Sequence, residues 1–407
     1  MYVVSRLRQG ACITRPILHS HSFSRLAQQH KPFVSKLYST NQSPPSAKVP
    51  PSSSKKSHLL KVVIGSVIVG TGYALYERSK AAKAPPIGNP QTSPEDFLLK
   101  EEVPELKVAR RFVNPSDQTG LKLTLFQYQP CPFCCKTRAL LDYYGLSYDV
   151  IEVNSVTRTQ VKWSDYKKVP ILVAETPSGQ KMKLTDSTMI ISAMASFLTD
   201  KSQSLLEVVS CFPRINYRDH DGKEKMDVMN KYFLMYKDAP THRTKEDIVN
   251  ERKWRRWVDD ELVHKLSPNV YRTPSEALQA FYWFEEMGDW KEHFATWERY
   301  LVIYFGALVM WIIGKRLKSR HHLKDDVRTS LYDDCNHWAK QVKKRGGRFM
   351  GGDKPNLADL GVYGVLSAIE GCDAFTDLMK YSDIRPWFEA TKEAIQSHEG
   401  QYLLQGR

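Results

Sequence analysis

The sequence has few cysteines, and its first 80 residues have almost no acidic side chains. Seven cysteines in 407 residues exclude a disulfide-rich secreted scaffold, and their odd number indicates reduced thiols. Residues 1–80 hold 12 Lys and Arg against one acid, Glu77, whereas the rest has 47 basic and 44 acidic residues. The net charge of +14 therefore belongs to the N-terminus, and we expect no nucleic-acid partner. The length and the 42% hydrophobic content suffice for two or three domains.

Residues 1–57 contain no Asp or Glu and many Ser, with Arg and Lys spaced among Leu, Val, Ile and Phe. This composition is typical of a mitochondrial transit peptide, because import depends on positive charge and an apolar helix face. The alternative is a disordered basic tail, which the stretch SPPSAKVPPSSSKK at 43–56 resembles. We expect a basic leader that directs import.

A long apolar run follows at residues 59–76. As a helix it would reach about 27 Å, marginally enough to cross a bilayer if Lys61 snorkels to the interface. We predict a single membrane anchor within residues 58–77 and a Pro-rich linker at 78–120. A second apolar run, at 301–313, covers about 20 Å and is expected to be a buried helix of the folded part.

From residue 121 the pattern predicts a thioredoxin-like α/β domain over residues 121–200. LKLTLFQY and SYDVIEV predict strands on either side of a helix that begins at the cysteines and ends at Gly145. VPILVAE and a short strand around 181–184 precede a closing helix, DSTMIISAMASFL. With a further helix expected before VPILVAE, the order is βαβ, helix, ββα.

The motif Cys131-Pro132-Phe133-Cys134 lies where a strand passes into a helix. Free N–H groups and the helix dipole stabilise a thiolate there, so Cys131 is expected to have a lowered pKa and to act as a nucleophile. A zinc site would need a second pair of ligands, and the remaining cysteines outside this motif are scattered, so we predict no metal. An inert pair of core thiols is the other alternative. Cys135 should point off the active face.

Two further positions favour a ligand that resembles a peptide. A cis bond between Val169 and Pro170, just before a buried strand, would turn the backbone groups of Val169 towards an extended peptide such as glutathione. Asp186 and Ser187 open the closing helix, and a helix N-terminus with a hydroxyl suits a ligand carboxylate. Taken singly, both fit ordinary strand entry and helix capping. Together with CPFC they favour a glutathione site.

After a connecting segment at 201–245 the sequence is helical over residues 246–400. Asn356, with Asp359 three residues later, predicts a capping-box start for one of these helices. A thioredoxin-like α/β domain followed by an all-α domain resembles the glutathione transferase architecture. That resemblance implies glutathione as cofactor and a homodimer.

Longer stretches carry a closer resemblance over about residues 121–395. LFQYQPCPFCCKTRALLDYYGLSYDVIEVN, WRRWVDDELVHKLSPNVYRTPSEAL and FMGGDKPNLADLGVYGVL are similar to the membrane-associated prostaglandin E synthases of type 2. The resemblance implies glutathione-dependent isomerisation of a lipid endoperoxide, prostaglandin H2, to prostaglandin E2. By position it implies a catalytic Cys131 with Tyr128 and Cys134, and glutathione binding by Val169, Pro170, Asp186 and Ser187.

The same resemblance implies haem beside glutathione, held by His264, Ser267, Arg316 and Arg320, and endoperoxide breakdown to a C17 hydroxy acid and malondialdehyde. His264 and Ser267 can share one helix face, and so can Arg316 and Arg320. Two arginines suit the propionate groups of haem. Without the resemblance, His264 would be a packed core histidine and KRLKSRHHLK a solvated helix end.

Two other functions fit these residues. CPFC alone supports a general glutathione-dependent thiol oxidoreductase or transferase. The haem positions support a membrane-tethered haem and glutathione binding protein without turnover. The leader predicts a mitochondrial membrane, and the alternative is a Golgi or perinuclear membrane with a soluble cytosolic form after cleavage.

Overall fold

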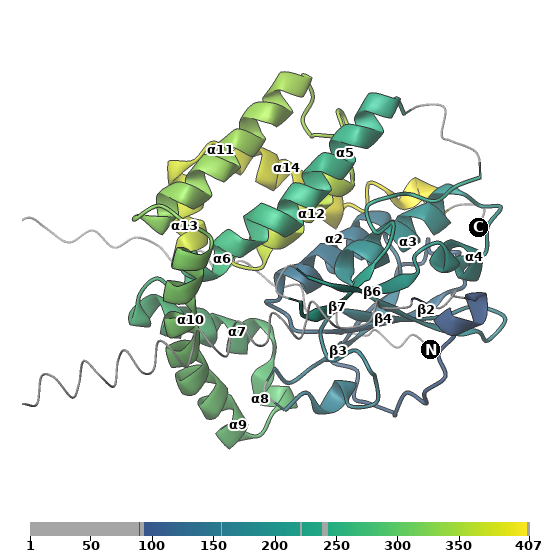
Figure 1. The fold of residues 1–407 in the computed structure, drawn as a ribbon, viewed down its shortest axis with the longest axis horizontal. Helices are drawn as coiled ribbons and strands as arrows, with labels where there is room; N and C mark the ends of the chain where they lie inside the picture. Colours follow the sequence, from purple (N-terminus) through teal and green to yellow (C-terminus); the bar gives the residue numbers. More distant parts are fainter. Residues whose placement is uncertain (1–88, 90–92, 156, 220–221, 238–242, 405–407) are drawn as a thin grey trace, which may run out of the picture. The chain divides into compact units, whose positions relative to one another are not determined.

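The computed structural model describes residues 89, 93–155, 157–219, 222–237 and 243–404 (Figure 1). The leader predicted at 1–57 and the anchor predicted at 58–77 lie outside the described residues.

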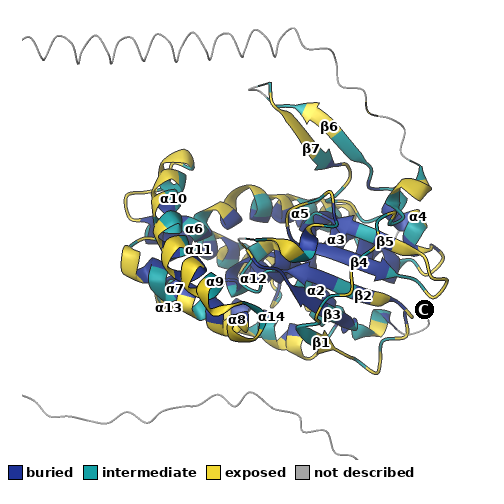
Figure 2. Cartoon of the chain, turned by 90° about the horizontal axis from the view of Figure 1, so that it is seen from below, coloured by how far each residue is buried: buried dark blue, intermediate teal, exposed yellow. Residues whose placement is uncertain are grey.

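A five-stranded sheet with strand order β1-β3-β2-β4-β5 carries the thiol motif. β2 and β3 are parallel, and the other neighbouring strands are antiparallel. In β4, Leu172 and Val173 belong to different hydrophobic clusters, because successive side chains point to opposite faces. Both faces of the sheet are therefore covered, which the continuous apolar run of β4 requires (Figure 2). The strands are β1 Arg110–Phe112, β2 Lys122–Gln127, β3 Tyr148–Glu152, β4 Ile171–Glu175 and β5 Lys181–Thr185.

The helices on this sheet follow the thioredoxin-like order. α2 (Pro132–Tyr144) ends at Gly145, whose φ of 69° is left-handed, and α3 (Ser187–Thr199) closes the unit. The prediction of a helix before β4 is wrong, because only a 3₁₀ turn, η2 (Thr159–Val161), forms there. That stretch is polar, and Val161 is the one buried apolar side chain within the turn. An amphipathic helix needs a longer row of apolar side chains on one face.

Two segments expected to be connections contain ordered elements. β1 lies within the predicted linker and pairs with β3, and Arg111 in this strand forms an ion pair with Asp149. Its sequence, RRF, is too short and too charged to show an apolar alternation. The other elements of these segments are the 3₁₀ helix η1 (Pro94–Phe97), α4 (Leu205–Ser210) and the hairpin of β6 (Arg214–Arg218) and β7 (Glu224–Val228).

The described residues from 245 onward form the expected all-α region. The capping box of Asn356 and Asp359 begins α12 as predicted, and Asp359 also accepts a hydrogen bond from Trp387 Nε1 at 2.8 Å. The elements are α5 (Lys245–Trp257), the π-helix η3 (Val258–Leu262), α6 (Val263–Val270), α7 (Pro274–Met287), α8 (Trp290–His293), α9 (Thr296–Tyr300), the π-helix η4 (Leu301–Phe305), α10 (Gly306–Arg320), α11 (Val327–Arg345), α12 (Leu357–Ser367), α13 (Asp373–Tyr381), α14 (Arg385–Gln396) and the 3₁₀ helix η5 (Gln401–Leu403).

The run at 301–313 is not the buried helix that we expected. It belongs to a continuous helical segment, Thr296–Arg320, which is long and apolar enough to cross a membrane and is only 22% buried over its most apolar window. Its apolar residues occupy both sides of the helix, and only one side packs on the protein. Phe305, for example, is 63% exposed.

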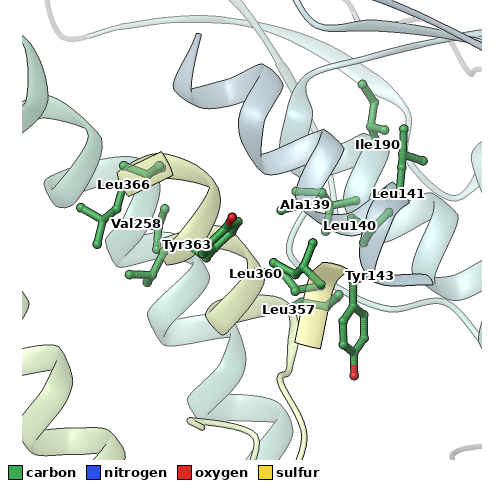
Figure 3. Close-up of a cluster of buried hydrophobic side chains, with 14 of the residues drawn as sticks. Ala139, Leu140, Leu141, Tyr143, Ile190, Val258, Leu357, Leu360, Tyr363 and Leu366 are labelled. Atoms are coloured by element: carbon green, nitrogen blue, oxygen red, sulfur yellow. The ribbon is translucent and has the colours of Figure 1, made fainter. Parts of the chain in front are cut away.

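The helical region meets the thiol-bearing unit where α12 packs on α2. Leu357 and Leu360 of α12 pack in the same core as Leu140 and Tyr143 of α2 (Figure 3). A Cβ added at Gly364 would lie 2.5 Å from Lys136 Cα, so the two helix backbones are in direct contact. This contact fixes the position of α2, and with it the first cysteine.

We predict that Gly364→Ala destabilises the protein by about 1–3 kcal/mol, because backbone atoms of α2 cannot move aside cheaply. Gly361→Ala is the matched control on the same helix. Its nearest neighbour would be Val258 Cγ2 at 3.8 Å, so this change should be neutral or stabilising by up to about 1 kcal/mol. Thermal unfolding midpoints compare the two variants, and equal midpoints would contradict the close contact.

Candidate functional site

Cys131 is the N-cap residue of α2, and its side chain is half-buried. Its backbone N–H donates to Tyr128 O at 3.1 Å, and its C=O accepts from Cys135 N at 2.8 Å. The tight turn and the first helical hydrogen bond therefore fix the Cys131 backbone on both sides. Its sulfur lies at the positive end of the helix dipole.

The pKa values of the two cysteines of the motif shift in opposite directions. The Cys134 thiol donates a hydrogen bond to the Cys131 sulfur, which lowers the pKa of Cys131. Burial raises that pKa, and the backbone N–H groups of Cys134 and Phe133 lower it further. Burial raises the pKa of Cys134 well above its usual range, and the hydrogen bond to Cys131 adds to the rise. Cys131 is therefore the more readily ionised thiol of the two, and the hydrogen bond from Cys134 favours its thiolate form.

Cys135 lies on another side of α2, as expected. It is buried, its thiol donates to Gln129 O at 3.4 Å, and it accepts from the Arg138 guanidinium at 3.1 Å. Burial raises its pKa, so it is a poor nucleophile. It lines a cavity of about 220 Å³ together with Tyr363 and Ser367.

Tyr128 packs against the hydrophobic cluster that contains Cys134 and Val169. Burial raises the pKa of its phenol, Arg158 opposes the rise, and the Cys131 thiolate adds to it. In the described part of the chain no hydrogen bond joins the Tyr128 hydroxyl to the Cys131 sulfur. The hydroxyl interacts with Arg158 instead, a residue that the sequence did not single out.

The Val169–Pro170 peptide bond is cis, as predicted. Among the described residues neither the N–H nor the C=O of Val169 has a hydrogen-bond partner. Val169 packs in the same cluster as Cys134, with Cys131 at its edge. An extended peptide beside Cys131 could therefore pair with these two backbone groups, as an added strand pairs with a sheet edge.

Asp186 and Ser187 form the N-terminus of α3. Asp186 has a φ of 69°, a region that disfavours side chains, and its carboxylate accepts from the N–H groups of Thr188 and Met189. Lys231 lies 3.4 Å from the same carboxylate. The Ser187 hydroxyl makes no hydrogen bond within the described residues, and Ser187 is 5% exposed.

Tyr166 and Lys231 are site residues that the sequence analysis missed. Tyr166 packs on the cluster that contains Cys134. Burial raises the pKa of Tyr166 to about 12, and the charges of Asp186, Cys134 and Cys131 add to the rise. Tyr166 belongs to the polar stretch before β4, and Lys231 follows the β6–β7 hairpin. Neither position shows a local pattern, because tertiary folding alone brings them to the site.

Buried polar contacts hold the turn before Cys131. Glu152 accepts from Gln129 N at 2.6 Å and from Arg110 at 2.8 Å. Arg138 donates to Gln129 O at 3.0 Å. Burial raises the pKa of Glu152, and Arg110 opposes the rise. Both backbone groups of Gln129 are therefore anchored two residues before Cys131.

The four haem positions lie on two neighbouring helices, α6 and α10. His264 is exposed, so it is not a core histidine, and its ring stacks on His321 at 4.5 Å. Ser267 follows one turn later on α6. Arg316 and Arg320 are exposed, and within the described ranges neither has a carboxylate partner.

We predict that Cys134→Ala raises the pKa of Cys131, because it removes the thiol donor. Cys134→Ser keeps a hydroxyl donor and should raise it less. Cys211→Ala, a half-buried thiol on another helix end, is the control and should leave it unchanged. The measurement is the pH dependence of iodoacetamide labelling at Cys131, followed by mass spectrometry. An unchanged midpoint in Cys134→Ala would contradict the assignment of Cys134 as the donor.

The chain is similar to several known proteins. Residues 123–176 match the glutaredoxin family model. The chain is 44% identical over 281 residues to prostaglandin E synthase 2 of Danio rerio, covering 68% of this chain and 72% of that protein. It is 46% identical over 295 residues to prostaglandin E synthase 2 of Mus musculus, covering 72% and 75%. A glutathione transferase F7 from Populus trichocarpa aligns at 12% identity with a TM-score of 0.38, over 69% of this chain and 99% of that one. The two relatives show that this chain belongs to the prostaglandin E synthase 2 family of enzymes.

Proposed function

We propose that this chain converts the endoperoxide prostaglandin H2 to prostaglandin E2 with glutathione, at Cys131. The observation that carries the proposal is Cys131 at the N-terminus of α2, with its pKa lowered by the Cys134 thiol, beside unpaired backbone groups of Val169. The names of the two relatives support the product.

Glutathione would bind in three places. Its cysteinyl part would pair with the N–H and C=O of Val169, beside Pro170. A carboxylate would accept from the Ser187 hydroxyl at the α3 N-terminus, and a charged end would face the Asp186–Lys231 pair, which offers both signs of charge. This arrangement would direct the glutathione sulfur towards Cys131.

The reaction then needs a base and a proton donor but no net oxidant. A base removes the hydrogen from the carbon that bears one peroxide oxygen, and the C–H electron pair forms the ketone as the O–O bond breaks. The other oxygen leaves as an alkoxide and takes a proton. We assign the base to the Cys131 thiolate and the proton donor to the glutathione thiol. Transfer of a proton from the Cys131 thiol to the glutathione thiolate restores both groups.

We also propose that haem binds beside this site through His264, Ser267, Arg316 and Arg320. The two exposed arginines without carboxylate partners in the described structure fit propionates, and His264 presents an exposed imidazole. When bound, haem would supply one-electron cleavage of the peroxide bond, with breakdown to a C17 hydroxy acid and malondialdehyde as the outcome.

The proposed setting is a membrane, with residues 59–76 as the anchor and a homodimer as the assembly. The acid-free leader favours a mitochondrial membrane. A Golgi or perinuclear membrane, with a soluble form after cleavage, is the alternative. Imaging of the full chain with a fluorescent tag separates the two locations.

We predict that Cys131→Ser lowers glutathione-dependent isomerase turnover in haem-free protein by about 100-fold or more, because the base is lost. Cys134→Ser should keep a substantial fraction, and Cys135→Ser should change little, since Cys135 points away from the site. Products are quantified from prostaglandin H2 with each folded variant, without and with added haem. Haem binding is followed by its absorbance.

The Cys134→Ser variant also separates the alternative, a general thiol oxidoreductase. Reduction of a disulfide by two thiols needs the second cysteine, whereas an isomerisation that restores the thiol in each cycle does not. A parallel assay on a glutathione mixed disulfide supplies the comparison. Full isomerase activity in Cys131→Ser would overturn the proposal, and absence of turnover in all assays would favour a binding protein.

A further inference from the structure

The helical segment Thr296–Arg320 packs on the protein with one face only. Val302, Ile303 and Ala307 are buried on that face, which lies against α6 and α7. A Cβ added at Gly306 would lie 2.6 Å from the Phe281 ring, so α10 begins in close contact with α7. This face is therefore occupied, and the segment cannot be surrounded by lipid as a membrane-spanning helix would be.

The opposite face carries an exposed apolar stripe, which we define as Trp297, Leu301, Phe305, Leu308 and Ile312. These residues are spaced four, four, three and four apart, so they follow one side of a helix. They are 42–66% exposed, and Trp297 and Phe305 are the most exposed of the five. A row of large apolar side chains of this length is unusual on a free surface and indicates something that covers it.

Aromatic and cationic side chains border the stripe. Tyr300 and Tyr304 lie beside it and are about half exposed, with an apolar ring and a polar hydroxyl. Lys315 lies at its C-terminal end, over the Trp311 ring at 4.1 Å, and like Arg316 it forms no ion pair in the described structure. Residues 299–324 contain no Asp or Glu. Glu298, beside Trp297, is the one acid of the segment Thr296–Arg320, and it accepts a hydrogen bond from Ala295 N. The surface is thus apolar, with unpaired positive charge at its C-terminal end.

We propose that this surface docks on an anionic lipid bilayer, with the helix lying in the plane of the interface. The apolar stripe would enter the acyl boundary, the tyrosines would lie at the headgroups, and Lys315 and its neighbours would meet lipid phosphates. Charge complementarity selects this occupant over a second copy of the chain. The same face of a second copy would bring the same unpaired cations, and its one carboxylate, that of Glu298, already accepts from Ala295 N.

The first experiment maps lipid contacts on the full chain. The protein is reconstituted in vesicles of phosphatidylcholine and phosphatidylglycerol with a lipid that carries a photoreactive group in its acyl chain, and the labelled residues are identified by mass spectrometry. We expect labels along the apolar stripe. Tyr381 and Tyr402, which are 57% and 51% exposed on other elements, are the matched controls and should remain unlabelled. Labels confined to residues 59–76 would overturn the proposal.

The second experiment removes the predicted anchor as a source of binding. In a full chain with Val62, Ile64 and Val67 changed to Asp, we expect vesicle binding to persist and to need anionic lipid. Adding Phe305→Ser and Leu308→Ser should weaken binding by at least about tenfold, since two large apolar groups no longer enter the lipid. Tyr381→Ser is the control and should have no effect.

A charge variant tests the electrostatic part with a residue outside the proposed haem set. Lys315→Gln should weaken binding to anionic vesicles by about fivefold at low salt and less at high salt. Isomerase activity and circular dichroism confirm that each variant is folded. If cross-linking joins the stripes of two copies in solution and no lipid labels them, the surface is a dimer interface and the bilayer proposal fails.

Discussion

The buried ion pair between Lys136 on α2 and Asp259 in the π-helix η3 is the contact on which the site depends. Lys136 Nζ donates to Thr188 Oγ1 at 3.1 Å, and Thr188 donates to Asp259 at 2.6 Å. Thr188 lies in the first turn of α3, so one cluster joins the thiol helix, the helix of the proposed glutathione site and the helical region. Burial would raise the pKa of Asp259, but Lys136, Thr188 and Tyr232 lower it below its usual range. The carboxylate therefore stays charged.

This cluster explains why a thiol motif needs the helical region to become a site. Two contacts hold α2 at Lys136: Gly364 of α12 lies against its backbone, and Asp259 pairs with its side chain. Glu152 anchors the turn that leads into Cys131. A cysteine at a helix N-terminus gains its low pKa locally, but its position relative to Val169 and Ser187 depends on these distant contacts.

The sequence predicted what is local and missed what is brought together by folding. The strand-to-helix junction at Cys131, the cis bond before Pro170 and the capping box at Asn356 each depend on a few neighbouring residues, and each is present. Tyr166 and Lys231 reach the site only through tertiary contacts, so no pattern identified them. The run at 301–313 is short for a membrane span and lies in a helical pattern, which predicts a buried helix, but its length does not show that only one face packs on the protein. In the structure Ile303 faces the core and Phe305 faces outward.

A double-mutant cycle at Lys136 and Asp259 tests the central claim most directly. Removing one partner leaves a buried charge unpaired, so Lys136→Met and Asp259→Leu should each destabilise the protein by about 3–5 kcal/mol and lower isomerase activity. The double variant should lose less than the sum of the two, with a coupling of at least about 1 kcal/mol in unfolding free energy. The exposed pair of Lys122 and Glu175 is the matched control cycle and should give a coupling near zero. Additive losses at Lys136 and Asp259, with unchanged activity in the single variants, would contradict the account.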